Sequence, residues 1–247
     1  MKIVICAAIG STLLSLLACT TPVNEEIDPG KPQKGIVSGR VLDTNGKPLA
    51  NADIAVNNSQ FYNNNILGKT DANGRYNLPV PPGSWYVRGT VTIRFDNKNY
   101  TLDLFPETTG TFAGTEGAVR NLRWKLSGEK PKEFGMAGYY GGSLEVYGAI
   151  GDFFDTDHVE FTFEPAGPLI DGSTGKTLTI KANTQSALDI PLGKYILTAR
   201  YLTTNQKMVL RQRNANQSYQ NSVTASFDPS YAGATGNYQL TLEVKLP

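Results

Sequence analysis

The chain lacks the residues on which much enzyme chemistry and disulfide stabilisation depend. Among its 247 residues there are one histidine, His158, and two cysteines, Cys6 and Cys19. A single histidine acts as a general base only when a nucleophile or a substrate proton lies in reach, and no Gly-x-Ser-x-Gly turn supplies a nucleophile. We therefore expect no enzymatic activity and no cofactor.

An excess of charge of either sign is also missing. The chain has 23 Lys and Arg against 22 Asp and Glu, for a formal net charge of +1. Binding of nucleic acid needs a basic face that neutralises phosphates. We therefore expect no nucleic-acid partner.

Long apolar runs are absent except at the start, where residues 3–17 follow Lys2. This run is shorter than the ~20 residues that a membrane-spanning helix needs. A basic start, a short apolar stretch and small residues at its end are typical of a secretory signal. Its last residues, Leu16-Leu17-Ala18-Cys19, resemble the lipobox of bacterial lipoproteins.

That resemblance implies a signal peptide at 1–18 and a diacylglycerol-modified Cys19 as the first mature residue. Cys6 would leave with the signal, so no disulfide is expected. Acyl chains at Cys19 would anchor the protein to a membrane, and we expect the bacterial cell envelope, at the outer membrane. The proline-containing residues 19–34 are interpreted as a flexible tether.

The rest of the chain is rich in turn residues, with 25 Gly and 14 Pro. Residues 35–127 show short alternating segments separated by Asp43-Thr44-Asn45-Gly46, Asp71-Ala72-Asn73-Gly74 and Pro81-Pro82-Gly83. Turn signals at this spacing, without a helical period, predict an all-β sandwich.

Four segments of this region resemble the carboxypeptidase regulatory-like domain, a transthyretin-like β-sandwich grouped with carbohydrate-binding-like folds. They are Gly39-Arg40-Val41-Leu42-Asp43, Gly46-Lys47-Pro48-Leu49, residues 70–76 and Pro82-Gly83-Ser84-Trp85. The resemblance implies an accessory module of an exported protein. The zinc peptidase in the family's name would need two histidines on the metal, and this chain has one.

A second β-sandwich, transthyretin-like or immunoglobulin-like, is predicted for residues 139–247, after a Gly-, Pro- and Lys-containing linker at 128–138. Residues 238–246 alternate cleanly between apolar and polar positions, as a half-buried strand does. Residues 80–87 and 190–197 also echo one another, because each has an apolar residue, Pro, Gly and then an aromatic two positions later.

Aromatic side chains are the candidate ligand contacts. Phe61, Tyr62 and Asn64 lie in a polar loop, and Tyr139 and Tyr140 follow the predicted linker. Flat rings beside amide groups suit stacking on a sugar. The alternative is that these rings fill the cores or seal the junction between the two sandwiches.

Asp152, Asp155 and Asp157 form the one acidic cluster considered for a metal, because Ca²⁺ prefers oxygen ligands. The cluster lacks the glycine and distal glutamate of an EF-hand loop, and a solvated loop is the alternative.

Two functional hypotheses follow. The first is a non-enzymatic cell-envelope lipoprotein that acts as an accessory or binding module, with a carbohydrate as the candidate ligand. The second is a structural or protein-interaction component of an envelope assembly.

Overall fold

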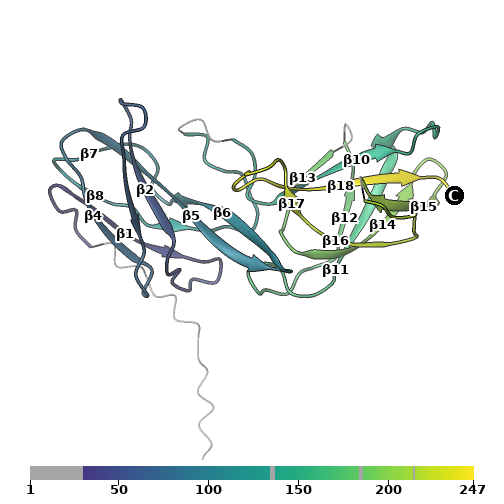
Figure 1. The fold of residues 1–247 in the computed structure, drawn as a ribbon, viewed down its shortest axis with the longest axis horizontal. Helices are drawn as coiled ribbons and strands as arrows, with labels where there is room; N and C mark the ends of the chain where they lie inside the picture. Colours follow the sequence, from purple (N-terminus) through teal and green to yellow (C-terminus); the bar gives the residue numbers. More distant parts are fainter. Residues whose placement is uncertain (1–29, 134–136, 184–185, 214) are drawn as a thin grey trace, which may run out of the picture.

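The computed structural model describes residues 30–133, 137–183, 186–213 and 215–247. The predicted signal peptide, Cys19 and most of the predicted tether lie outside these ranges. In the ranges described, no helix is long and apolar enough to cross a membrane. The all-β prediction is confirmed: strands form two sheet systems, which we call the first and the second sandwich (Figure 1).

The first sandwich has strands in the order β3-β2-β5-β6-β9-β1-β4, with β7 paired to β5 and β8 to β1. Its strands are β1 (Ile36–Leu42), β2 (Asp53–Asn58), β3 (Asn65–Lys69), β4 (Arg75–Pro79), β5 (Ser84–Phe95), β6 (Lys98–Pro106), β7 (Phe112–Ala113), β8 (Ala118–Val119) and β9 (Leu122–Arg123). β8 and β9 are separate two-residue strands, both parallel to β1.

The second sandwich repeats this arrangement, in the order β12-β11-β14-β15-β18-β10-β13. Its elements are β10 (Gly142–Gly148), the 3-10 turn η2 (Thr156–His158), β11 (Val159–Pro165), β12 (Leu178–Lys181), β13 (Ser186–Ile190), β14 (Lys194–Tyr201), β15 (Gln206–Gln212), β16 (Val223–Ser226), β17 (Asp228–Pro229) and β18 (Tyr238–Lys245). β10 is parallel to β18, as β1 is to β9. Each strand on the path of the second sheet thus has a counterpart in the first.

The sequence echo marks the same corner in both sandwiches. The indole Nε1 of Trp85 donates to the carbonyl of Pro81 at 3.0 Å, and the hydroxyl of Tyr195 donates to the carbonyl of Pro191 at 2.7 Å. Both rings are buried at the start of a central strand. In each case the large ring closes the corner by satisfying a proline carbonyl four residues earlier.

The joint between the sandwiches is built by the β5–β6 hairpin. Gly89 pairs with Leu104 across fourteen intervening residues, whereas the equivalent pair in the second sandwich, Ala199 and Met208, encloses eight. The longer hairpin turns at Asp96, where the backbone φ is positive, as a two-residue hairpin turn requires. Six further residue pairs follow Gly89–Leu104 and two follow Ala199–Met208, so each strand of the first hairpin is four paired residues longer, or about 13 Å.

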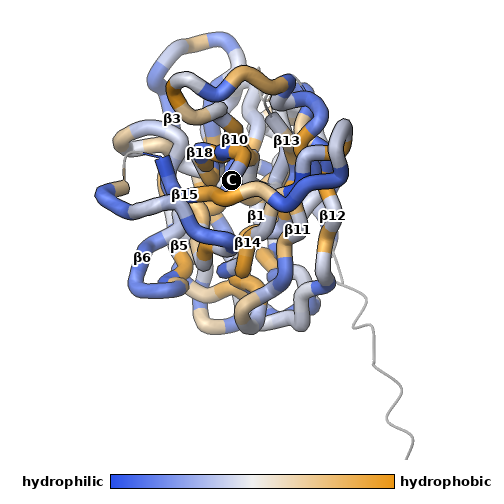
Figure 2. Tube along the Cα trace, turned by 90° about the vertical axis from the view of Figure 1, so that its right-hand side faces the viewer, coloured by the Kyte–Doolittle hydropathy of each residue, from blue (hydrophilic) through white to orange (hydrophobic). Residues whose placement is uncertain are grey.

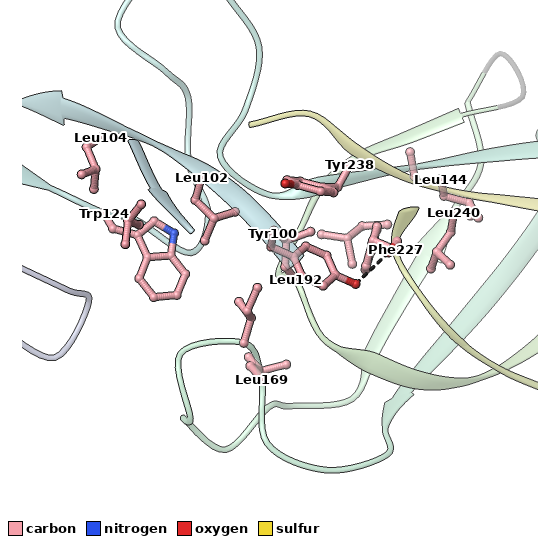
Figure 3. Close-up of a cluster of buried hydrophobic side chains, with 14 of the residues drawn as sticks. Tyr100, Leu102, Leu104, Trp124, Leu144, Leu169, Leu192, Phe227, Tyr238 and Leu240 are labelled. Carbon is pink, nitrogen blue, oxygen red and sulfur yellow. Dashed lines mark hydrogen bonds between the residues drawn. The ribbon is translucent and has the colours of Figure 1, made fainter. Parts of the chain in front are cut away.

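Tyr100, near the tip of this hairpin, lies buried in the joint (Figure 3). Its hydroxyl donates to the carbonyl of Phe227 at 2.7 Å, and its ring lies 4.8 Å from that of Tyr238. Buried side chains of the two sandwiches consequently form one continuous hydrophobic cluster, which runs from Val37 to Val244. Viewed along the long axis, the apolar segments lie inside and the hydrophilic loops outside (Figure 2).

The predicted linker also takes part in the joint. The ammonium of Lys130 is almost completely buried and donates to Asp103 and to the carbonyl of Gly236, each at 2.8 Å. Asp103 belongs to the first sandwich and Gly236 to the second. A buried charge needs such partners, so Lys130 holds the two sandwiches in a fixed register.

Candidate ligand-binding groove

The loop between β2 and β3 presents Phe61, Tyr62 and Asn64 to solvent. Asn58 shapes it, because its side-chain oxygen accepts from the backbone amides of Gln60 and Phe61 at 2.9 and 3.0 Å. The ring of Phe61 is 65% exposed and that of Tyr62 is fully exposed. These side chains form a projecting loop tip and do not line the groove described below.

Tyr140 is not placed to meet a ligand. It is 7% exposed, its ring packs edge-on against Phe105 at 5.7 Å, and the ammonium of Lys125 lies 5.8 Å from the ring centre. Burial raises the pKa of its phenol to about 12. The structure therefore gives Tyr140 the alternative role, as a side chain that seals the junction.

Tyr139 lies beside a groove of about 310 Å³ on the second sandwich. Its lining residues are Gly138, Tyr139, Gly141, Gly142, Ser143, Leu188, Asp189, Ser230, Tyr231, Asn237 and Tyr238. They come from the segment before β10, from β10 and β13, from the segment that joins β17 to β18, and from the first residue of β18. This volume is at the lower end of the range for small-molecule sites.

Exposed apolar side chains mark the groove. Tyr231 is 64% exposed and Leu188 is 57% exposed, while Tyr139 is half-buried. Ser143 reaches the groove because β10 alternates, with Leu144 directed into the core and Ser143 outward. The surface therefore combines two tyrosine rings and a leucine with nearby hydroxyl groups.

Asp189 is the only charged residue among the groove-lining residues. Its backbone is in the left-handed region, with φ of 62°. Both carboxylate oxygens lie 2.8 Å from the backbone amide of Gly128, and one also accepts from Gly141 at 3.2 Å. Because these backbone donors hold the carboxylate, Asp189 orders the junction, and it gives the groove one negative charge among otherwise neutral side chains.

Sequence reasoning found Tyr139 but missed Tyr231 and Leu188. Tyr231 lies in a turn-rich segment more than ninety residues from Tyr139. Only the pairing of β10 with both β18 and β13 brings these segments together. The one feature of the sequence that pointed to this part of the groove is Tyr231, an aromatic residue in a polar, turn-rich segment.

The acidic cluster does not assemble a metal site. Asp155 caps η2, accepts from the amide of Asp157 at 2.9 Å, and lies 2.9 Å from Nδ1 of His158. Asp152 instead accepts from the backbone amide of Leu246. Across the described ranges, no three His, Cys, Asp or Glu residues gather in a way that could hold a metal ion.

The fold and the groove together define an all-β protein of two fused β-sandwiches with an open surface groove, whose lining includes one charged residue, Asp189. Residues 36–104 match the family model of the carboxypeptidase regulatory-like domain. The resemblance read from the sequence is thus confirmed for that segment. No curated protein matches the chain.

Three solved structures are similar to this chain at low sequence identity. The Bacillus anthracis TIE protein is 16% identical with a TM-score of 0.32, and the match covers 86% of this chain but 34% of that one. The major pilin subunit BcpA of Bacillus cereus is 13% identical with a TM-score of 0.25, covering 86% and 99%. A B repeat of the Staphylococcus aureus collagen-binding surface protein is 11% identical with a TM-score of 0.26, covering 86% and 98%.

Proposed function

We propose that this chain is a non-enzymatic lipoprotein of the bacterial cell envelope that binds a carbohydrate in the Tyr139–Tyr231 groove. Cys19 would carry the lipid, and residues 19–34 would hold the folded part away from the bilayer. The observation that supports ligand binding is that Tyr139 and Tyr231 both line a groove of about 310 Å³.

The chemistry of the groove favours a neutral sugar over an anionic ligand. A tyrosine ring offers a flat apolar face for the C–H side of a pyranose and a hydroxyl for its rim. Ser143, Ser230 and Asn237 add groups that both donate and accept hydrogen bonds. An anionic ligand would meet no cation among the groove-lining residues, and the carboxylate of Asp189 would repel it.

A soluble chain that begins at Gly30 is suited to the test, because every described strand lies within residues 36–245. A glycan array would select the sugar, and calorimetry would then measure its affinity. We expect Tyr231→Ala to weaken binding by roughly 5- to 150-fold, because loss of an aromatic ring that stacks on a flat ligand costs about 1–3 kcal/mol, as it does for stacked bases, and about 1.4 kcal/mol is tenfold.

Tyr62→Ala is the matched control, since Tyr62 is also an exposed tyrosine but lies on the other sandwich. It should bind as the unmodified chain does. If Tyr62→Ala abolishes binding while Tyr231→Ala does not, the β2–β3 loop is the site and the groove is not. Absence of any glycan binding would leave the second function below.

The second candidate function is a structural component of an envelope assembly. The continuous core and the buried Lys130–Asp103 pair favour it, because they make the two sandwiches one stiff body. Such a body suits a spacer or a scaffold as well as a ligand-binding module.

A further inference from the structure

The joint inside this chain shows which ends of the two sandwiches fit together. The first sandwich contributes its β1–β2 loop, where the hydroxyl of Thr44 donates to Asp171 at 2.6 Å, and its β5–β6 hairpin. The second sandwich receives them with its β11–β12 loop, which carries Asp171, and with the corner around Lys194. We call the first set of loops the leading end and the second set the receiving end.

Because the two sandwiches have the same strand order, the second sandwich also has a leading end and the first sandwich also has a receiving end. The second sandwich has a leading end of its own, formed by the residues after β10 and by the β14–β15 turn. It lies beside the C-terminus, far from the joint (Figure 1). The first sandwich has a receiving end of its own, formed by the β2–β3 loop and the corner before β5.

Large apolar side chains are exposed on both unpaired ends. On the leading end of the second sandwich, Ile150 and Phe153 are fully exposed and Leu202 is 37% exposed. On the receiving end of the first sandwich, Phe61 is 65% exposed and Tyr62 is fully exposed. Clustered exposure of this kind marks a contact surface more often than chance does.

Two carboxylates near the leading end are held by partners within the same chain. Asp152 accepts from the amide of Leu246, and Asp155 lies 2.9 Å from His158. The β14–β15 turn itself is uncharged, with Thr203, Thr204 and Asn205 following Leu202.

We infer that the leading end of the second sandwich binds the receiving end of the first sandwich in a second copy of this chain. In this contact the two copies meet end to end in the way that the two sandwiches meet within one chain. It is heterologous, since two different surfaces meet, and it leaves each complex with one free end of each kind. Successive copies would therefore add head to tail.

The contact between copies is weaker than the internal joint. The β14–β15 hairpin is four paired residues shorter in each strand than β5–β6, so no side chain equivalent to Tyr100 reaches a neighbouring core. Only the loop-tip residues remain, and a small interface of that kind gives a transient complex. Association should therefore depend steeply on protein concentration.

Sedimentation equilibrium of the chain that begins at Gly30 tests this inference. The average mass should rise with concentration. A leading-end variant, Ile150→Ser with Phe153→Ser, and a receiving-end variant, Phe61→Ser with Tyr62→Ser, should each remain monomeric. Leu67→Ser is the matched control, because Leu67 is 74% exposed but belongs to neither end, and it should associate as the unmodified chain does.

Mixing the two end variants gives the decisive result. Each retains the surface that the other lacks, so an equimolar mixture should form a dimer of one copy of each and nothing larger. A monomeric unmodified chain at all concentrations would overturn the inference, and so would self-association of either end variant. Far-ultraviolet circular dichroism and Tm establish that the variants are folded, and none of these substitutions touches the Tyr139–Tyr231 groove.

Discussion

Tyr100 should couple the stability of the two sandwiches. It extends from β6 of the first sandwich into the joint, is 2% exposed, and donates to the carbonyl of Phe227 in the second sandwich. Two substitutions separate its contributions. Tyr100→Phe removes only the hydroxyl, whereas Tyr100→Ala removes the ring as well.

The magnitudes follow from burial. Tyr100→Phe leaves the carbonyl of Phe227 without its phenol donor, which costs about 1–3 kcal/mol. Tyr100→Ala adds a cavity beside Tyr238, and loss of a buried aromatic ring costs about 3–5 kcal/mol. For a folded part of this size about 1 kcal/mol lowers Tm by roughly 2–4 °C, so Tyr100→Ala should lower Tm by roughly 6–20 °C.

Differential scanning calorimetry is the assay. The unmodified chain should unfold in one transition, because its core is continuous. In Tyr100→Ala the transition should move down or split as the sandwiches lose their coupling. The exposed Tyr62→Ala should change stability by no more than about 0.5 kcal/mol. Two separate transitions in the unmodified chain, or a loss of stability below about 1 kcal/mol for Tyr100→Ala, would contradict coupling of the two sandwiches through Tyr100.

Two other predictions concern acid stability and the anchor. A hydrogen bond from Ser226, together with the ammonium of Lys194, lowers the pKa of Asp96 in the folded protein. The ionised Asp96 therefore stabilises the fold above the unfolded pKa of about 4, and this stabilisation is lost as the pH falls below that value. Asp96→Asn should therefore reduce the difference between the urea unfolding midpoints at pH 7 and pH 3, and an unchanged difference would count against this role. Cys19→Ser should release the full-length protein from membranes on cell fractionation, whereas continued membrane association would contradict lipid anchoring.

The local part of the fold could be predicted because it depends on short-range chemistry. Asp71 illustrates this: its side-chain oxygen accepts from the amides of Asn73 and Arg75, each at 2.8 Å, so the turn is built by residues that are adjacent in sequence. Alternation within β18 likewise places its apolar residues in the core. By contrast, the short edge strands β3 and β13 show little apolar–polar alternation in sequence, so no local pattern predicts them.

The candidate ligand site was only half predictable. A half-buried tyrosine and a buried one can look alike in sequence, as Tyr139 and Tyr140 show. Neighbours along a strand point to opposite faces, and which face is covered depends on residues far away. Phe105 covers Tyr140, while the Tyr231 segment leaves Tyr139 at the edge of an open groove.

Residue types and spacings of a few residues are enough to predict the all-β class, the turns, the family resemblance of residues 36–104 and the lack of a histidine pair or a nucleophile turn. The folded chain is needed to show that the two sandwiches share one strand order and one core, and that Lys130 is buried between them. Those properties depend on contacts between residues more than a hundred positions apart, such as Tyr100 with Phe227, which no local pattern encodes.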